Sequence, residues 1–440
     1  MIEDTRKIAV KVLLRASQSS TYSNIALDNI LDRYELSDPD RGLLTAIVMG
    51  VTERRLTLDR IIDRLAARAD KIDAETRILL QVGIYQIVYL DRIPDHAAVN
   101  ETVSLAPRRS RGFVNAILRS LLRLRDGNGL DTLFPDKENS PVEYLSAYYS
   151  FPTDICERFI KIYGYERTER IFGVFNSAPR LTLRINTLKI SRDEYAGLLE
   201  ERDISFSLSE RLDDAIVLRD TSFSKLPGFD EGYFFVQDEA SQICVDALGA
   251  ESGELVIDCC SCPGSKSFGS AIRMKNKGEV LSFDLHQSKL GLIDSGARRL
   301  GIDIIGTAVR DGREPDESLF GRADRVLCDV PCSGLGVIAK KPEIRYKKTE
   351  DITRLPKIQY DILEKSSQYL RRGGVLVYST CTVLPEENQA NVERFLAEHT
   401  DFEPLDFTVG GRESKKGMLS LSPDTDGTDG FFISKMIRKQ

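Results

Sequence analysis

Two cysteines stand in settings that suit covalent chemistry. Cys332 lies in Asp329-Val330-Pro331-Cys332-Ser333-Gly334, three residues after an acid, and Cys381 lies in Ser379-Thr380-Cys381-Thr382. Each follows an apolar run typical of a buried parallel strand, so we expect both thiols at the sheet edge where ligands bind in open α/β folds. A single cysteine at a strand end is usually a small packed residue. Two of them at one edge, with an acid nearby, indicate nucleophilic catalysis.

A second candidate site is the loop after the predicted strand Leu255–Asp258. Its small residues would let a ligand approach the backbone closely, and the helix that follows would offer free N–H groups. Neither G-x-x-x-x-G-K-[ST] nor G-x-G-x-x-G occurs, which argues against a phosphate loop. The candidate cofactor-binding residues of this loop are Asp258, Cys260, Ser261, Cys262, Pro263, Gly264, Ser265 and Lys266.

Acidic residues follow four predicted strands, at Asp258, Asp284, Asp311 and Asp329. A carboxylate at Asp284 suits a ribose diol, and Asp311 suits an adenine amino group. The acidic crevice therefore favours a nucleoside cofactor with positive charge, such as the sulfonium S-adenosyl-L-methionine. The alternative is that each acid only caps a helix, a contribution of about 0.5–2 kcal/mol.

Composition indicates a soluble globular chain of two or three domains, with 440 residues and a net charge of −7. No apolar run approaches the roughly 20 residues of a membrane helix, and the N-terminus does not resemble a signal peptide. Eight cysteines are too few for a disulfide scaffold and suggest a reduced, cytoplasmic protein. Structural zinc at Cys259, Cys260 and Cys262 is an alternative, but no second pair at finger spacing follows. We expect no metal.

Residues 1–126 are predicted to form an all-helical domain. Helical apolar spacing repeats through it, and Ser37-Asp38-Pro39 is a typical helix start. Residues 1–125 hold 20 Lys and Arg against 16 Asp and Glu, and Val103–Arg125 contains arginines without an acid. A solvated helix face is the alternative to a phosphate-facing patch there. The candidate RNA contacts in it are Arg108, Arg109 and Arg111.

The rest of the chain is predicted to form two further domains after a polar linker at 126–140. Residues 141–235 mix helices and short strands, as in a small α+β subdomain. Residues 236–440 alternate strand and helix, which predicts a largely parallel sheet with helices on both faces and a late antiparallel strand near 427–437. The fold class is thus an all-α bundle, an α+β subdomain and an α/β Rossmann-like domain.

Two sets of motifs resemble known families. Leu36-Ser37-Asp38-Pro39-Asp40-Arg41 and Gly112-Phe113-Val114-Asn115-Ala116-Ile117-Leu118-Arg119 resemble the NusB family of RNA-binding helical domains. The loop at 258–267, Asp329–Gly334 and Ser379–Thr382 with Pro385-Glu386-Glu387-Asn388 resemble the RNA 5-methylcytosine methyltransferases, and together the chain resembles the RsmB (Fmu, Sun) type of 16S rRNA methyltransferase.

This resemblance implies a class I methyltransferase domain that uses S-adenosyl-L-methionine on 16S rRNA, at position 967 for this type. It implies that Cys381 attacks cytosine C6, that Cys332 helps release the adduct, and that Asp329 holds the base near N3 and N4. Lys266 is a candidate for lowering the pKa of Cys381. Neither a membrane nor a protein partner is expected.

Two departures from the family pattern concern the cofactor loop. Ser265 replaces its second glycine, which would be costly if that position needs a positive φ. Cys259 and Cys262 replace apolar or alanine residues, and the hypothesis that follows is that these two thiols make the loop sensitive to oxidation. Mild peroxide that left both thiols unmodified would dismiss it.

Further RNA contacts are expected at Arg180 and Arg184, on one face of a predicted strand, and at Lys340, Lys341 and Arg345. The target base would have to be unstacked to reach the site. Two alternatives stay open: a non-catalytic RNA-binding or ribosome-assembly factor that retains the fold, and the same chemistry on a tRNA or another rRNA cytosine.

Overall fold

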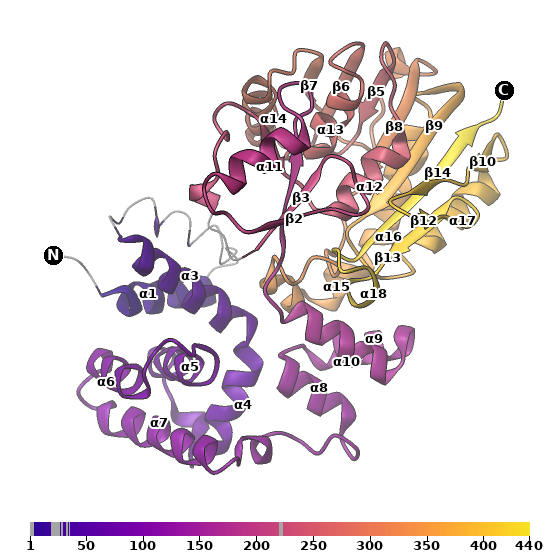
Figure 1. Ribbon diagram of the computed structural model, residues 1–440. Coiled ribbons are helices and arrows are strands. Elements are labelled where there is room, and N and C mark those ends of the chain that lie inside the picture. Colours follow the sequence, from indigo (N-terminus) through magenta and orange to yellow (C-terminus); the bar gives the residue numbers. More distant parts are fainter. Residues whose placement is uncertain (1–3, 19–26, 28–29, 32–33, 35, 220–222) are drawn as a thin grey trace. The chain divides into compact units, whose positions relative to one another are not determined.

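The chain, seen in a computed structural model, consists of two compact units (Figure 1). The structure describes residues 1–440 except 1–3, 19–26, 28–29, 32–33, 35 and 220–222. The first unit comprises residues 1–177 together with 338–347, and the second comprises residues 178–337 together with 348–440. The polypeptide therefore leaves the second unit for a short segment and then returns to it.

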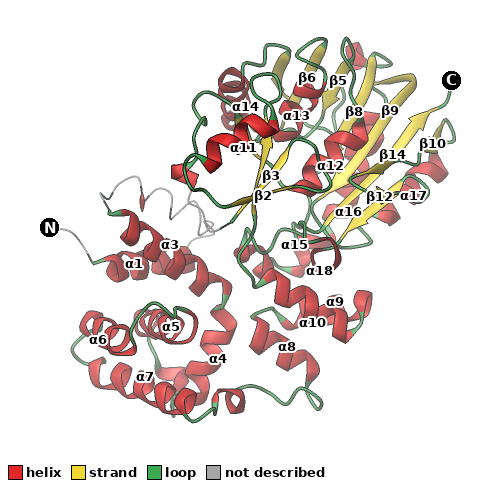
Figure 2. Ribbon diagram, viewed as in Figure 1, coloured by secondary structure: helices red, strands yellow, loops and turns green. Residues whose placement is uncertain are grey.

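The first unit is helical, as predicted (Figure 2). The helix α3 begins where the sequence indicated, with Ser37 Oγ accepting a hydrogen bond from the Asp40 amide at 3.3 Å and Pro39 in the first turn. Its apolar face, including Leu44 and Ile47, lies in the core of the unit. The helical elements of this unit are α1 (Thr5–Gln18), α3 (Asp38–Glu53), α4 (Arg55–Leu65), η1 (Ala69–Lys71), α5 (Ala74–Tyr89), α6 (Asp95–Leu105), α7 (Arg111–Asp126), η2 (Leu130–Leu133), α8 (Pro141–Tyr149), α9 (Thr153–Tyr163), α10 (Tyr165–Phe175) and η5 (Pro342–Tyr346).

Residues 126–177 group with the first unit. Within the expected linker, η2 buries Leu133 to 4% exposure in the helical core, because two leucines give this polar stretch an apolar side. Residues 141–177, expected in the α+β subdomain, form α8–α10 and group with the first unit. Stacked aromatic rings, with Phe151 and Phe172 centroids 3.8 Å apart, hold these helices together.

The second unit contains a small antiparallel sheet of order β2-β3-β1-β4. Its helix α11 starts with a capping box between Ser191 and Glu194. The elements are β1 (Leu181–Ile185), α11 (Arg192–Glu200), β2 (Phe206–Leu208), β3 (Ala215–Leu218), η3 (Phe223–Lys225) and β4 (Phe234–Val236).

The larger sheet of the second unit has the order β10-β14-β9-β8-β5-β6-β7, with β13 paired to β14. Strands β7, β6, β5, β8 and β9 run parallel and β14 is antiparallel to β9, so the α/β fold class is confirmed. The elements are α12 (Glu239–Leu248), β5 (Leu255–Asp258), α13 (Ser265–Arg273), β6 (Glu279–Asp284), α14 (Gln287–Leu300), β7 (Ile305–Val309), η4 (Glu317–Leu319), β8 (Ala323–Asp329), α15 (Thr349–Thr353), α16 (Leu355–Ser367), β9 (Leu370–Thr380), α17 (Gln389–Glu398), β10 (Phe402–Pro404), β11 (Thr408–Val409), β12 (Arg412–Glu413), β13 (Met418–Leu421), α18 (Pro423–Asp426) and β14 (Phe431–Arg438).

Successive residues of the central strands belong to two separate cores, one on each face of the sheet. Val256 packs with residues of α12–α14, and Ile257 packs with residues of α16 and α17. Strands buried on both faces read as continuous apolar runs, which is why the sequence located them well. The strand order reverses between β5 and β8, so Asp258 and Asp329 end neighbouring strands at a topological switch point. Among the described helices, none is long and apolar enough to span a membrane.

Candidate active site

The two motif cysteines lie in contact. Cys332 Sγ and Cys381 Sγ are 2.9 Å apart, and the Cys381 amide donates to Cys332 Sγ at 3.3 Å. Neither forms a disulfide bond, and both have intermediate exposure, directly past the carboxyl ends of β8 and β9. Parallel pairing of these strands, with Asp329 opposite Ser379, brings the two loops together. The expected meeting of the thiols at one edge is therefore present in the fold.

Glu387 fixes the two cysteine loops to each other. Its carboxylate Oε2 accepts from the Ser333 amide at 2.9 Å and from Gln359 Nε2 at 2.7 Å, and the residue is completely buried. Ser333 Oγ and Thr382 Oγ1 are 2.6 Å apart, which ties the loops a second time. The sequence pointed to Glu387 only as part of a motif, and its partners 28 and 54 positions away were not visible there.

Asp329 is held from two sides. Lys266 Nζ donates to its Oδ2 at 2.6 Å and Ser379 Oγ donates to its Oδ1 at 2.8 Å. The side chain of Lys266 is 10% exposed and that of Asp329 is 26% exposed. Burial alone would lower the pKa of Lys266, but the Asp329 carboxylate and nearby thiols, including Cys381, outweigh it and raise the pKa. The ammonium group stays charged next to the cysteine pair.

The environment favours the protonated form of Cys332. The hydrogen bond with Cys381, followed by burial, raises the pKa of Cys332 well above its ordinary value. A thiol with a raised pKa is protonated at neutral pH and can donate to the Cys381 sulfur.

The cofactor loop places its positive φ at Gly264 and not at Ser265. Gly264 has φ +106°, and a Cβ there would lie 2.6 Å from the Phe268 ring. Ser265 is the first residue of α13 and is not among the residues with positive φ. The strain considered for Ser265 is thus absent, because the neighbouring glycine makes the turn. Burial raises the pKa of Cys260 and of Cys262. The oxidation sensitivity expected for Cys259 and Cys262 stays a prediction.

Asp258 is the buried acid of this loop, at 1% exposure. Ser267 Oγ donates to its Oδ2 at 2.7 Å, whereas Oδ1 has no hydrogen-bond partner among the residues that the structure describes. Burial, as the largest cause, raises the pKa of Asp258 to about 7. A carboxylate with an unmatched oxygen favours a positively charged neighbour, such as a sulfonium or ammonium group.

The two remaining acids also make local turns. Asp284 Oδ1 accepts from the His286 amide at 3.0 Å, and Asp311 accepts from the amide of Arg313 at 3.0 Å and from its Nη2 at 2.5 Å. The side chain of Arg313, as the largest cause, lowers the pKa of Asp311. Both carboxylates keep acceptor capacity for a hydroxyl or amino group. The residues of this edge therefore fit a nucleoside cofactor with positive charge.

The predicted RNA contacts need two corrections. Arg184 is 3% exposed, because its side of β1 packs against α12, and its Nη2 pairs with Asp246 at 3.1 Å. Arg345 is fully buried in the first unit and donates to backbone carbonyls. Both predictions are wrong, since neither guanidinium reaches the surface.

The other predicted RNA contacts have exposed or partly exposed side chains. Lys340 is partly exposed, and the exposed residues are Arg108, Arg109, Arg111, Arg180 and Lys341. No group of three or more His, Cys, Asp or Glu residues in the described part of the chain could hold a metal ion.

Three family descriptions match the chain in succession. Residues 3–123 match the NusB family, residues 151–222 match the RsmF/B-like ferredoxin-like domain, and residues 245–437 match the 16S rRNA methyltransferase RsmB/F. The last match contains the cysteine pair and all four acidic strand ends.

Full-length relatives and solved structures are similar. The Probable ribosomal RNA small subunit methyltransferase B of Bacillus subtilis is 37% identical, covering 99% of this chain and 98% of its own. Ribosomal RNA small subunit methyltransferase B of Yersinia enterocolitica is 32% identical over the same shares of the two chains. The crystal structure of PH0851 covers 100% of both chains with a TM-score of 0.80 and 25% identity. NSun6 from Pyrococcus horikoshii with SFG, at 22% identity and a TM-score of 0.60 over 66% of this chain and 99% of that one, shares the fold.

Proposed function

Because this chain belongs to the 16S rRNA methyltransferase RsmB/F family, we propose that it methylates C5 of a cytosine in 16S rRNA through a covalent adduct at Cys381. The single observation that carries the proposal is the 2.9 Å contact between Cys332 and Cys381 beside the Lys266–Asp329 pair. The target base is position 967 by family resemblance. The reaction takes place in the cytoplasm, where 16S rRNA is made.

The cofactor is S-adenosyl-L-methionine, which supplies an electrophilic methyl group when bound. Asp284 would hold the ribose hydroxyls and Asp311 the adenine amino group, beside the loop from Asp258 to Lys266. The unmatched Oδ1 of Asp258 and the fold of the loop around Gly264 support this choice. The protein's task is to bring that methyl group to a carbon that is normally a weak nucleophile.

Cys381 makes the carbon nucleophilic. Its thiolate adds to C6 of the cytosine, and the C5=C6 electron pair forms the new bond from C5 to the methyl carbon. The bond between that methyl carbon and the sulfonium sulfur breaks, which leaves S-adenosyl-L-homocysteine. Asp329 accepts a hydrogen bond from the N4 amino group of the base, beside N3, while Lys266 and Ser379 hold its carboxylate in place. Lys266 also favours the charged form of Cys381.

Release reverses the addition. Solvent water takes the C5 proton, the C5=C6 double bond forms again, and the bond between C6 and the Cys381 sulfur breaks and returns the thiolate. Cys332, whose thiol is protonated, donates to the departing sulfur across the 2.9 Å contact and stabilises it. The two cysteines thus have different tasks, one in attack and one in release.

Methyl transfer to RNA tests the proposal directly. Incubation with labelled S-adenosyl-L-methionine and 16S rRNA should place 5-methylcytosine at one position. Absence of label despite measured cofactor binding would refute the enzymatic function and favour an assembly factor, and label on tRNA only would change the substrate.

The order of the cysteines has its own test. Cys332→Ser should accumulate a covalent RNA–protein adduct that survives a denaturing gel, because release is slowed. Cys381→Ser should form none. Identical behaviour of the two variants would show that the roles are assigned wrongly.

We also propose that the exposed Arg108, Arg109, Arg111, Arg180 and Lys341, with the partly exposed Lys340, contact RNA phosphates. Their combined replacement by glutamine should weaken RNA binding and reduce its dependence on salt.

A further inference from the structure

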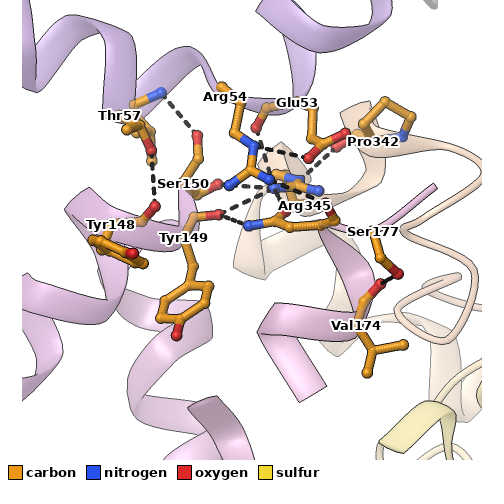
Figure 3. A network of polar contacts seen from close by, with 12 residues as sticks. Glu53, Arg54, Thr57, Tyr148, Tyr149, Ser150, Val174, Ser177, Pro342 and Arg345 are labelled. Atoms are coloured by element: carbon orange, nitrogen blue, oxygen red, sulfur yellow. Dashed lines mark hydrogen bonds and ion pairs between the residues drawn. The ribbon is translucent and has the colours of Figure 1, made fainter. Parts of the chain in front are cut away.

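Arg345 in the first unit and Arg184 in the second are both buried arginines, but they have different partners. Arg345 donates from Nη1 to backbone carbonyls of its own unit, those of Glu53 and Tyr149 (Figure 3). Arg184 lies on β1, between β3 and β4 in the small sheet, and is 3% exposed. Its terminal nitrogens reach side chains outside that sheet. Because burial of a cation is costly, the partners of Arg184 indicate what its position serves.

Arg184 joins the small sheet to α12 and to the residue just before that helix's start. Its Nη2 donates to Asp246 Oδ1 on α12 at 3.1 Å. Its Nη1 donates at 3.4 Å to the Oε1 of Gln237, which stands between β4 and α12. The Gln237 amide donates to the Thr182 carbonyl at 3.1 Å, which ties the same residue to β1 through the backbone. Gln237 is 3% exposed, so water does not compete for these hydrogen bonds.

Gln237 in turn contacts the cofactor loop. Its Nε2 donates to the Ser265 carbonyl at 3.1 Å, and Ser265 is the first residue of α13. The two ends of one side-chain amide therefore connect the buried guanidinium to the loop. A guanidinium only donates and a carbonyl only accepts, so the amide between them has one favoured orientation.

Close packing between the small sheet and α13 supports the same arrangement. A Cβ at Gly269 on α13 would lie 3.0 Å from Arg184 Nη1, so the absence of a side chain there lets the guanidinium approach the helix. Phe235 on β4 meets Phe268 on α13 edge to face, with ring centroids 5.9 Å apart. The Phe268 ring is also the group that leaves no room for a Cβ at Gly264. The small sheet thus packs directly against the residues that shape the cofactor loop.

We propose that Arg184 is a positioning residue for S-adenosyl-L-methionine: acting through Gln237, it fixes the loop from Asp258 to Lys266 in the form that binds the cofactor. This inference rests on the proposed function, which assigns the cofactor to that loop. It gives the small sheet of the second unit a task in cofactor binding. It also accounts for an arginine that does not reach the surface to contact RNA.

The variant Arg184→Met should fold. Methionine is flexible enough to fill the space of the arginine stem. Asp246 loses one partner, but its side chain is 24% exposed and Arg273 Nη1 lies 3.7 Å from it, so no buried charge is left unpaired. Gln237 keeps its backbone contact with Thr182 and loses the group that orients its side-chain amide.

The test measures cofactor affinity by calorimetric titration of the full chain with S-adenosyl-L-methionine. Arg325→Met is the matched control, since the Arg325 side chain is 15% exposed and pairs with Glu254 at 2.9 Å, before β5, whereas the cofactor loop follows β5. We expect the Kd of Arg184→Met to rise about 3- to 10-fold, the scale of one lost hydrogen bond. Arg325→Met should keep the wild-type Kd. An unchanged Kd in Arg184→Met, or an equal rise in both variants, would overturn the proposal.

A double variant tests whether Arg184 acts through Gln237. Gln237→Met removes the contact with the Ser265 carbonyl directly, so it should raise the Kd at least as much as Arg184→Met does. The double variant should bind the cofactor no more weakly than Gln237→Met alone, because both changes break one connection. A rise equal to the product of the two single rises would refute that connection. If Arg184→Met does not fold, Gln237→Met carries the test, and an unchanged Kd in it would overturn the proposal.

Two further readouts separate positioning from a general loss of stability. In methyl transfer, Arg184→Met should raise the KM for S-adenosyl-L-methionine and leave both the KM for 16S rRNA and kcat at saturating cofactor unchanged. In the cofactor-free protein, peptides covering 258–273 should exchange hydrogen faster in Arg184→Met than in Arg325→Met. A raised KM for RNA with an unchanged KM for the cofactor would contradict the proposal, as would equal exchange in the two variants.

Failure of the proposed function is distinguishable from failure of this inference. Wild-type protein that binds the cofactor but methylates no RNA would refute the function, whereas active wild type with wild-type cofactor affinity in Arg184→Met would refute only the positioning role.

Discussion

Replacing Asp258 by asparagine tests the chemistry of the cofactor loop through pH. The pKa of Asp258 is raised from 3.8 to about 7, mainly because the carboxyl group is buried. A folded-state pKa above the unfolded value means that this group stabilises the fold fully below the unfolded pKa, and that the stabilisation is lost as pH rises through about 7. Asparagine does not titrate, so the variant should not show this loss.

The size of the effect follows from the two pKa values. At pH 5 the folded carboxyl is mostly protonated and the unfolded one mostly ionised, and at pH 8 both are mostly ionised. With about 1.4 kcal/mol for each pKa unit, wild type should lose about 2–3 kcal/mol of stability between these pH values through Asp258 alone. A buried amide without a partner costs about 1–3 kcal/mol at every pH. The free energy of unfolding of Asp258→Asn, relative to that of wild type, should therefore rise by about 2–3 kcal/mol from pH 5 to pH 8.

Native-state hydrogen exchange measures this difference locally, which matters because a chain of two units need not unfold in one step. The exchange rates of peptides from β5 and α13 are compared between variant and wild type at pH 5, 6, 7 and 8. Each rate is divided by the intrinsic exchange rate of the unfolded peptide at the same pH. Asp230→Asn, at an exposed aspartate of the same unit, is the control. A difference between Asp258→Asn and wild type that stays constant from pH 5 to pH 8 would refute the reasoning, since it would mean that Asp258 is ionised throughout.

Further predictions concern the residues around the cofactor loop and the cysteine pair. Gly264→Ala should weaken cofactor binding in a titration, because its Cβ would meet the Phe268 ring, whereas Ser265→Gly should leave binding unchanged and cost at most about 1 kcal/mol in thermal unfolding. Tighter binding by Ser265→Gly would contradict this view of the loop. Lys266→Met should move the acid limb of the methyl-transfer pH profile to higher pH, because loss of a cation raises the pKa of a neighbouring thiol; an unmoved limb would exclude Lys266 as the activating group. Glu387→Gln should slow adduct formation in rapid-quench experiments without changing cofactor affinity, and an unchanged rate would show that the clamp between the cysteine loops is dispensable.

The position of both cysteines at one edge of the sheet could be predicted because its signals are local. Buried parallel strands are continuous apolar runs, and the residues after them must lie at one edge, so the meeting of Cys332 with Cys381 followed from topology alone. The choice between Gly264 and Ser265 did not follow, since both fit the loop and only the backbone decides which takes the positive φ.

The burial of charged side chains was the main feature that could not be predicted from the sequence. Arg184 and Arg345 lie in segments whose composition suggests a basic surface, yet each is enclosed by groups far away in the chain. Asp246 is 62 positions from Arg184, and Glu53 is 292 positions from Arg345. Charge type is a local property, but the partners that make burial of an arginine possible are not.

The path of the chain has a consequence for how the two units can be separated. The polypeptide crosses between them three times, after Ser177, after Val337 and after Lys347. Protease cleavage at Ser177 alone would therefore yield two fragments on a denaturing gel, residues 1–177 and 178–440. The larger fragment would still contain residues 338–347, called here the strap, which belong to the helical unit. The two fragments should stay together under native conditions, and neither should be obtained well folded by expressing it alone. A chimaera that takes the helical unit from a relative would likewise have to include the strap. Recombination at a single point in the gene therefore cannot transfer the whole helical unit.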